Sequence, residues 1–235
     1  PAHVYWPFGN FSGVYSPLTR MLQGMGGLVA HRFRVEQFHD YLVRFRPDWV
    51  GLPPAGVQMI LDAGIPVEDF SSVTYARVGS APLPATAHRE FEDRYGIPIL
   101  QAYGATEFGG PVTNMPLEGY SEWGRRKLGS VGLPFKGARL RAVDAETGDE
   151  LPAGTPGLLE VIAPRMGPDW IRTTDQGLVD EDGFVWLRGR ADGAINRGGF
   201  KLLPEAIEAA LVLYPSLAAG VAPRVSHSRP WQVSP

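Results

Sequence analysis

The sequence contains no cysteine among its 235 residues. This absence excludes disulfide bonds, thiolate metal sites and a cysteine nucleophile, and it fits the cytoplasm, where structural disulfides are rare. Any zinc site would therefore need histidines. The five histidines are scattered, at positions 3, 31, 39, 88 and 227, and no pair stands four apart on an evident helix. We expect them at the surface or in hydrogen-bonded core positions.

Long apolar runs and a strong net charge are also absent. No apolar run approaches the ~20 residues of a membrane-spanning helix, and the first residues do not resemble a signal peptide. With 44% hydrophobic and 20% charged residues, the composition is that of a globular protein, and the net charge of −3 argues against a nucleic-acid partner, since phosphate backbones are usually met by a basic face. The dense basic run Arg125-Arg126-Lys127 is short, and we expect it to be a solvated loop.

The first half of the chain alternates between helical and strand patterns. Apolar residues from Val35 to Arg46 recur at spacings of three and four, which indicates an amphipathic helix. The full expected order is helix, strand, helix, strand, helix, strand, over residues 35–46, 48–53, 55–63, 73–80, 84–96 and 97–100. This order predicts an α/β fold with a mostly parallel sheet and flanking helices. In such sheets ligands bind just beyond the strand ends.

The pattern changes after about Gly129. Short strands separated by glycine, proline and aspartate turns are expected within 138–144, 157–163 and 178–189. The dipeptide Asp182-Gly183 is a hairpin signal. Farther along, 204–214 predicts a short helix. A β-rich subdomain therefore follows the α/β part.

Two glycine-rich segments carry polar residues that indicate a binding site. "QAYGATEFGG" (101–110) sets Tyr103, Thr106 and Glu107 among glycines, directly after an apolar run. Taken alone, it is equally compatible with a tight turn whose polar groups cap a helix. A second segment, 172–211, combines an aspartate in a turn, a hairpin, an arginine beside glycines, and a glycine-rich turn before a helix. Glycine allows a backbone to approach a ligand closely.

With both segments in view, the sequence resembles the adenylate-forming superfamily of acyl-CoA synthetases, luciferases and peptide-synthetase adenylation domains. "YGATE" (103–107) is similar to the Tyr-Gly-x-Thr-Glu loop of that family, and "VGSAPLP" (78–84) is similar to its glycine-glycine-alanine-proline loop. "GRADGAINRGGFKLLPEAIE" (189–208) resembles its hinge motif. The likeness runs from Trp6 to about Gly220, and the motifs stand in family order.

The resemblance implies a domain organisation. Residues 1–189 would be part of the large N-terminal AMP-binding domain, α/β to about 128 and β-rich over 129–189. Residues 190–194 would form the hinge, and 195–235 the beginning of a small, truncated α+β C-terminal domain. The family's loop around the β- and γ-phosphates and its C-terminal catalytic lysine have no counterpart in the printed sequence. The resemblance therefore implies that the printed chain is inactive alone.

The resemblance also implies a nucleotide-binding set. Tyr103 would lay its ring on the adenine, beside Gly104. Asp175 would accept both ribose hydroxyls, and Arg190 would reach the same sugar. A small loop would let adenine and the acyl group pass close to the backbone. That loop consists of Gly79, Ser80, Ala81 and Pro82.

By the same resemblance, Thr106 and Glu107 would be the catalytic residues. Thr106 would donate its hydroxyl to the α-phosphate of ATP, and Glu107 would hold the Mg²⁺ that bridges phosphate oxygens.

Further residues take roles from the resemblance alone. Gly104 and Asn10 would line the acyl pocket, where the family often has histidine at the position of Asn10. Asp192 would be the hinge residue. Gly198 and Gly199 would line the path of the thiol. One departure concerns Asp175, because Thr174 replaces the family glycine before it and is expected to crowd the turn.

The implied activity is that of an acid–thiol ligase. It would form an acyl-CoA from a fatty or other apolar carboxylic acid, ATP and coenzyme A, through an acyl-adenylate and with Mg²⁺. Pro204 favours the CoA-ligase branch, because peptide-synthetase domains tend to have glycine in that turn. Two alternatives stay open: an adenylation enzyme that loads a carrier protein, and a non-catalytic nucleotide-binding remnant. We expect a cytoplasmic protein without a nucleic-acid partner, and the sequence leaves open whether it forms a homo-oligomer.

Overall fold

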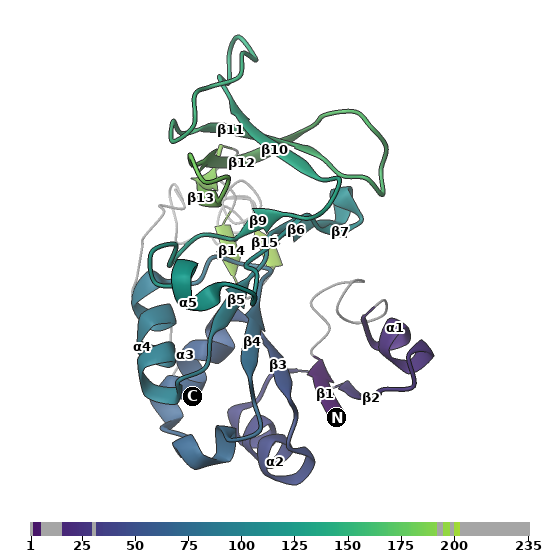
Figure 1. The fold of residues 1–235 in the computed structure, drawn as a ribbon, viewed down its shortest axis with the longest axis vertical. Coiled ribbons are helices and arrows are strands. Elements are labelled where there is room, and N and C mark those ends of the chain that lie inside the picture. The colour runs from purple at the N-terminus through teal and green to yellow at the C-terminus, as the bar shows by residue number, and fades with distance from the viewer. Residues whose placement is uncertain (1, 6–15, 30–31, 192–194, 198–199, 203–235) are drawn as a thin grey trace, which may run out of the picture.

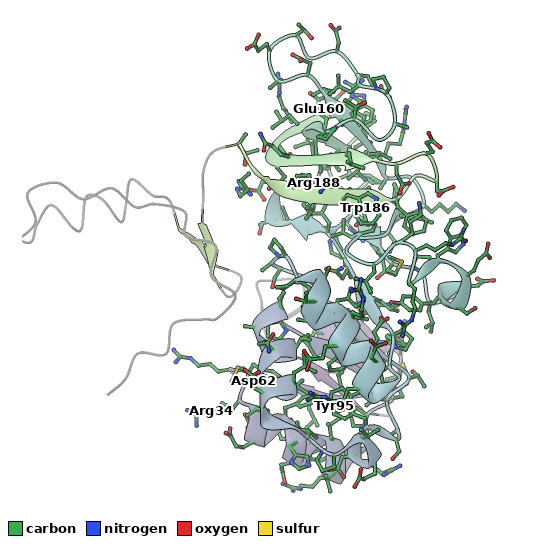
Figure 2. All side chains as sticks on the ribbon, turned by 90° about the vertical axis from the view of Figure 1, so that its left-hand side faces the viewer. Arg34, Asp62, Tyr95, Glu160, Trp186 and Arg188 are labelled. Atoms are coloured by element: carbon green, nitrogen blue, oxygen red, sulfur yellow. The ribbon has the colours of Figure 1, made fainter. Side chains whose placement is uncertain are left out.

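The structure is a computed structural model that describes residues 2–5, 16–29, 32–191, 195–197 and 200–202. An α/β part lies at one end and an antiparallel β-rich part at the other, with very short strands between them (Figure 1). Figure 2 shows the same division, with Tyr95 in the helical part and Glu160 and Trp186 in the β-rich part. Within the described ranges, no helix combines the length and apolar character needed to cross a membrane.

A five-stranded parallel sheet forms the α/β part. Its order is β2-β1-β3-β4-β5, and each pair of neighbours is parallel. The strands are β1 (Ala2–Tyr5), β2 (Gly26–Val29), β3 (Trp49–Leu52), β4 (Tyr75–Val78) and β5 (Ile99–Gln101). Parallel neighbours need crossover connections, which helices supply here. The α/β fold with a mostly parallel sheet is confirmed.

Three helices pack on one face of this sheet. They are α2 (Val35–Phe45), α3 (Pro54–Ala63) and α4 (Ala85–Tyr95), with a short 3₁₀ helix, η2 (Val67–Phe70), before β4. Side chains alternate along a strand, so Val50 and Leu52 share a face with their register partners Ala76 and Val78. All four are buried against the apolar faces of the helices. This packing produces the core of the α/β part.

The ends of these helices follow from local chemistry. The C-terminal caps are Arg46, Gly64 and Gly96, which adopt left-handed φ angles of 43°, 61° and 66°. Each cap donates its N–H to a carbonyl in the last helical turn. Glycine reaches this conformation without a Cβ clash, which is why the sequence marks two of the three ends clearly.

Some elements of the α/β part were not predicted. The helix α1 (Ser16–Leu22) buries none of its residues, so no apolar period marks it. The strands β1 and β2, of four residues each, were not predicted either. The helix α5 (Tyr120–Trp123) has a single turn, which is too short for a periodic spacing of apolar residues to show in the sequence.

An antiparallel sheet in the order β10-β11-β12-β13 forms the β-rich part. Its strands are β10 (Arg139–Val143), β11 (Gly157–Ile162), β12 (Ile171–Val179) and β13 (Val185–Arg190). The predicted hairpin at Asp182-Gly183 is confirmed, because the turn between β12 and β13 contains Gly183 at φ 83°. Asp180 fixes this turn by accepting the N–H of Phe184 at 2.9 Å.

Among the described residues, three pairs of short strands lie outside the two large sheets. They are β6 (Gly104–Ala105) with β7 (Gly110–Pro111), β8 (Thr113–Asn114) with β9 (Leu133–Pro134), and β14 (Ile195–Arg197) with β15 (Phe200–Leu202). The helix predicted over 204–214 lies outside the described residues.

Lys127 joins the two parts of the molecule. Its ammonium lies 2.8 Å from Oδ2 of Asp180 and 2.6 Å from Oδ2 of Asp182. The same ammonium lies over the rings of Trp123 and Phe184, which contact each other. The prediction of a solvated loop is therefore wrong for Lys127, whose side chain is only 12% exposed. A long lysine stem can cover apolar rings while its ammonium reaches carboxylates.

A buried polar network ties α4 to β5 and α5. Nε2 of His88, a residue only 1% exposed, lies 3.0 Å from Oε1 of Glu92. The same oxygen accepts the N–H of Ile99 at 2.8 Å and the hydroxyl of Tyr120. Burial alone would raise the pKa of Glu92, but the hydrogen bonds from His88, Ile99 and Tyr120 outweigh it and hold that pKa below its ordinary value. Glu92 is therefore a structural carboxylate that is ionised at neutral pH.

We expect Glu92→Gln to lower the free energy of unfolding by about 1 to 2 kcal/mol at pH 7, because it removes the charge from this network. Since the folded-state pKa of Glu92 lies below its unfolded value, the stabilisation is fully present above the unfolded value of about 4.5 and is lost as the pH falls through the folded pKa. Urea unfolding at pH 7 and at several values below 4.5 measures the difference between variant and parent. The difference in the free energy of unfolding between Glu92→Gln and the parent should shrink on acidification.

Glu90→Gln on the same helix is the matched control for this prediction. Glu90 pairs with Arg94, but its side chain is 53% exposed, so its loss should cost no more than about 0.5 kcal/mol. A Glu92→Gln difference that stays constant with pH would contradict the assignment.

Candidate functional site

The candidate site begins where two neighbouring parallel strands end. Val78 and Gln101, the last residues of β4 and β5, are register partners. The N–H of Ala102 donates to the carbonyl of Val78 at 3.0 Å. Loop 79–82 and the loop after β5 therefore leave the sheet at the same edge. A Cβ on Gly79 would lie 3.3 Å from the carbonyl oxygen of Ala102, so a residue without a side chain suits this contact.

Loop 79–82 has an unusual backbone. Ser80 adopts φ 72°, in the left-handed region that residues with a side chain seldom occupy. Ser80 and Pro82 are exposed, while Gly79 and Ala81 are half-buried. Backbone conformations of this kind gather at functional sites, where the surrounding structure holds them in place.

The segment after β5 folds into a small hairpin over residues 103–111, called here the Tyr103 hairpin. The strands β6 (Gly104–Ala105) and β7 (Gly110–Pro111) pair antiparallel, and the 3₁₀ helix η3 (Thr106–Phe108) forms the tip. A Cβ on Gly104 would lie 2.4 Å from Cα of Pro111, so the two strands approach this closely only with glycine. Phe108 is buried and packs edge-on against the ring of Tyr103, with centroids 5.8 Å apart. The aromatic pair anchors the hairpin.

Thr106 and Glu107 lie exposed on the tip of this hairpin. Neither side chain forms a hydrogen bond or ion pair with any residue that the structure describes. A lone carboxylate beside a hydroxyl fits Mg²⁺, which usually takes one or two protein carboxylates and completes its shell with substrate phosphates and water. Within the described ranges no group of three acidic or histidine residues could hold a metal by itself.

Asp175 connects the hairpin to the β-rich part. The hydroxyl of Tyr103 donates to Oδ2 of Asp175 at 2.6 Å, and Nη1 of Arg190 donates to Oδ1 at 2.8 Å. Asp175 and Arg190 face each other as register partners on β12 and β13. These contacts bring together three residues that the sequence predicted for one site.

The backbone around Asp175 differs from the expected turn. Asp175 lies inside the nine-residue strand β12, and the register shifts between Gln176 and Gly177. The hydroxyl of Thr174 hydrogen-bonds the guanidinium of Arg190. The hydroxyl of Thr173 donates to a carbonyl of β11 at 2.8 Å and accepts the N–H of Asp175 at 3.0 Å. Sequence reasoning missed this support, since no motif distinguishes Thr173 from an ordinary strand residue.

Tyr103 remains a hydrogen-bond donor at physiological pH. Burial, and then the neighbouring charge of Asp175, raise the pKa of its phenol well above the ordinary value of 10.0. The residue is only 7% exposed, so little of it is open to a planar ligand. Its hydroxyl is fixed on Asp175.

The remaining predicted site residues cannot be placed. Asn10, Asp192, Gly198 and Gly199 lie outside the described residues. The acyl pocket, the hinge and the thiol path therefore stay predictions. The part of the site that the structure describes comprises loop 79–82, the Tyr103 hairpin and the Asp175–Arg190 pair.

Comparison with known proteins identifies relatives of the chain. Residues 2–167 match the family described as AMP-binding enzyme. A protein named probable CoA ligase CCL9, from Humulus lupulus, is 32% identical over 210 residues, which is 82% of this chain and 39% of that protein. Sulfoacetate–CoA ligase from Cupriavidus necator is 28% identical over 92% of this chain and 44% of its own length. The chain thus spans less than half the length of these curated relatives.

A solved structure is similar to most of the chain. ATP-bound MatB from Rhodopseudomonas palustris is 26% identical, with a TM-score of 0.71 over 91% of this chain and 45% of that one.

Proposed function

The chain belongs to the AMP-binding enzyme family, and from this membership we propose that residues 2–191 form the nucleotide-recognition part of an acid–thiol ligase. In the proposed reaction a carboxylate oxygen attacks the α-phosphorus of ATP and pyrophosphate leaves. The thiol of coenzyme A then attacks the acyl carbon of the acyl-adenylate, and AMP leaves. The observation that carries this proposal is the contact of Tyr103, Asp175 and Arg190 beside the carboxyl ends of β4 and β5.

Asp175 is the proposed ribose acceptor. Each carboxylate oxygen has two lone pairs, and Tyr103 and Arg190 each take one. One acceptor direction is left on each oxygen for a ribose hydroxyl. The two bonds already present would hold the carboxylate in place while it binds the sugar, so little ordering remains to be done on binding.

Loop 79–82 and the Tyr103 hairpin are the proposed walls for adenine and the acyl group. Gly79 and Gly104 keep the backbone free of side chains at two close approaches. The exposed part of the Tyr103 ring would contact the adenine.

Thr106 and Glu107 are the proposed catalytic residues. Both side chains are exposed and form no bond within the described part of the chain, which leaves them available for phosphate and metal. The Thr106 hydroxyl would donate to the α-phosphate, and Glu107 would hold Mg²⁺. When bound, Mg²⁺ neutralises charge on the phosphate oxygens.

Several finer assignments are also proposals. We assign a fatty or other apolar acid as substrate, coenzyme A as acceptor, a hinge at Asp192 within 190–194, and a small domain over 195–235. Asn10 would line the acyl pocket, and Gly198 with Gly199 the thiol path. We also assign the protein to the cytoplasm. An enzyme that loads a carrier protein and a non-catalytic nucleotide-binding remnant are the alternatives.

Acid-dependent exchange of labelled pyrophosphate into ATP tests the proposal. The assay compares the 235-residue chain with a family-length protein that contains it. The acid panel includes fatty acids and sulfoacetate, the acid in the name of one relative. We propose that exchange requires the family-length protein. Thioester formation on free coenzyme A or on a carrier protein separates the two enzyme alternatives, and a lack of exchange by both proteins with every acid would favour the remnant.

We expect Tyr103→Phe to raise the Kd for a non-hydrolysable acyl-adenylate analogue by about three- to tenfold, because the Tyr103 hydroxyl bonds Asp175 and its loss removes only the positioning of that carboxylate. The ring stays in place, so the loss is partial. Because the pKa of Tyr103 is raised, its hydroxyl stays a donor at and above the ordinary value of 10.0. The difference in Kd between Tyr103→Phe and the parent should therefore not disappear as the pH reaches 10.0.

Isothermal titration calorimetry measures this difference. Tyr41→Phe is the matched control, because its hydroxyl bonds only the exposed Gln37 side chain among the described residues. Equal affinities of Tyr103→Phe and the parent would contradict a role for the Tyr103 hydroxyl.

A further inference from the structure

Thr113, the first residue of β8, follows the Tyr103 hairpin in the chain and is completely buried. Its hydroxyl accepts the N–H of Tyr103 at 3.1 Å and donates to the carbonyl of Val131 at 2.7 Å. The N–H of Thr113 in turn donates to the carbonyl of Tyr103 at 3.2 Å. One side chain thus satisfies a buried donor and a buried acceptor on two different segments.

The segment on the far side of this hydroxyl runs along β13. The N–H of Val131 donates to the carbonyl of Val185 at 2.9 Å, and the N–H of Val185 donates to the carbonyl of Gly132 at 3.0 Å. The buried Ser130 hydroxyl also donates to the carbonyl of Val185, at 2.8 Å. Val185 is the first residue of β13, and Arg190 is its last. Hydrogen bonds therefore lead from Tyr103 through Thr113 to the strand that carries Arg190.

A hydroxyl suits this position for a chemical reason. The Tyr103 N–H needs an acceptor and the Val131 carbonyl needs a donor, and a hydroxyl can be both at once. Valine would fill nearly the same volume but would leave both backbone groups without this partner, and a buried polar group that loses its partner is costly. Serine would keep the hydroxyl and lose only a methyl group.

We propose that Thr113 is a positioning residue of the nucleotide site, which sets the backbone of Tyr103 so that its hydroxyl meets Asp175. The inference rests on the proposed function, since it gives this contact a role in binding nucleotide. Thr113 itself touches no ligand.

The first test needs no ligand. Hydrogen exchange is measured for peptides that contain the Tyr103 amide in the parent 235-residue chain, Thr113→Val and Thr113→Ser. We expect the valine variant to exchange about five- to tenfold faster at this amide, and the serine variant to stay within about twofold of the parent. Equal protection in parent and valine variant would overturn the proposal.

The second test measures the Kd of the same chains for a non-hydrolysable acyl-adenylate analogue. Thr113→Val should raise the Kd by about five- to tenfold, and Thr113→Ser should restore it to within about twofold. In a Tyr103→Phe background the effect of Thr113→Val should shrink to about twofold or less, because the hydroxyl is gone and only the small ring contact is left for Thr113 to position. A merely structural role would leave the effect unchanged in that background, which would overturn the proposal.

Ile60→Val is the stability control, because Ile60 is fully buried in α3, away from the hairpin, and its truncation weakens the core. It should lower the urea midpoint without changing the Kd. If Thr113→Val unfolds at the assay temperature, Thr113→Cys replaces it, with a similar volume and a poor hydrogen-bond group, and the same direction is expected.

The outcomes separate the two proposals. Binding by the parent with equal binding by the Thr113 variants overturns only the role of Thr113. An absence of binding by the parent overturns the proposed function of the chain, and this inference with it.

Discussion

Glu107→Gln is expected to reduce acid-dependent exchange of pyrophosphate into ATP by about 10²- to 10³-fold, the usual cost of losing one preorganised charge contact in a transition state. Glutamine keeps the length and shape of the side chain, but it is neutral and a much weaker ligand for Mg²⁺. The exposed position of Glu107 on η3 means that no packing is lost with the charge. The assay uses a family-length protein that contains this segment.

Glu118→Gln controls for the loss of an exposed negative charge close in sequence to this hairpin. It should leave exchange within about twofold of the parent, because it lies outside the site and surface substitutions usually have small effects. Raising the Mg²⁺ concentration should partly restore the Glu107→Gln protein. Full activity of that protein at low Mg²⁺ would show that Glu107 does not hold the metal.

Asp175→Ala is the second variant with a large expected effect. We expect the Kd for a non-hydrolysable acyl-adenylate analogue to rise by about 10- to 150-fold, which corresponds to losing about 1.5 to 3 kcal/mol of hydrogen bonding to a charged group. The substitution also removes the partner of the buried Tyr103 hydroxyl and of one Arg190 nitrogen. The free energy of unfolding should therefore fall as well, so calorimetry is done well below the midpoint of thermal unfolding.

Glu160→Gln is the matched control for Asp175→Ala. Glu160 also lies in the β-rich sheet and pairs with an arginine, Arg141, at 2.7 Å. Figure 2 shows it farther than Trp186 from the α/β part. It should change stability without changing the Kd. A Kd for Asp175→Ala equal to that of the parent would refute the assignment of Asp175 to the ribose.

The sequence predicted the elements whose pattern is local. The spacing of apolar residues marked α2, and Gly96 marked the end of α4, because both signals lie within a few residues of the feature they specify. Asp182-Gly183 marked the hairpin for the same reason. The site residues could be named only through a resemblance to a known family, since a tyrosine and an aspartate 72 residues apart show no local sign of their contact.

The missed features depend on tertiary burial. Thr113 and Thr173 became supports of the site because the chain around them is packed and their hydroxyls face backbone groups of other segments. Lys127 was expected in solvent, and it instead covers two aromatic rings contributed by segments 61 residues apart in the chain, Trp123 and Phe184. A sequence pattern gives residue type and spacing but not which distant segment will cover a residue.

The span of the Tyr103–Asp175 bond has a consequence for folding. Contacts between distant residues close large loops of chain and tend to form slowly. The bond spans 72 residues, and the Lys127–Asp180 bridge spans 53. Both join the α/β part to the β-rich part, so we expect the proposed nucleotide site to be complete only after each part has formed its own sheet. A ligand that binds only the completed pocket stabilises the folded chain by mass action, by about 2.7 kcal/mol at one hundred times its Kd. The lifetime of this protein against proteolysis would then rise and fall with the supply of its nucleotide.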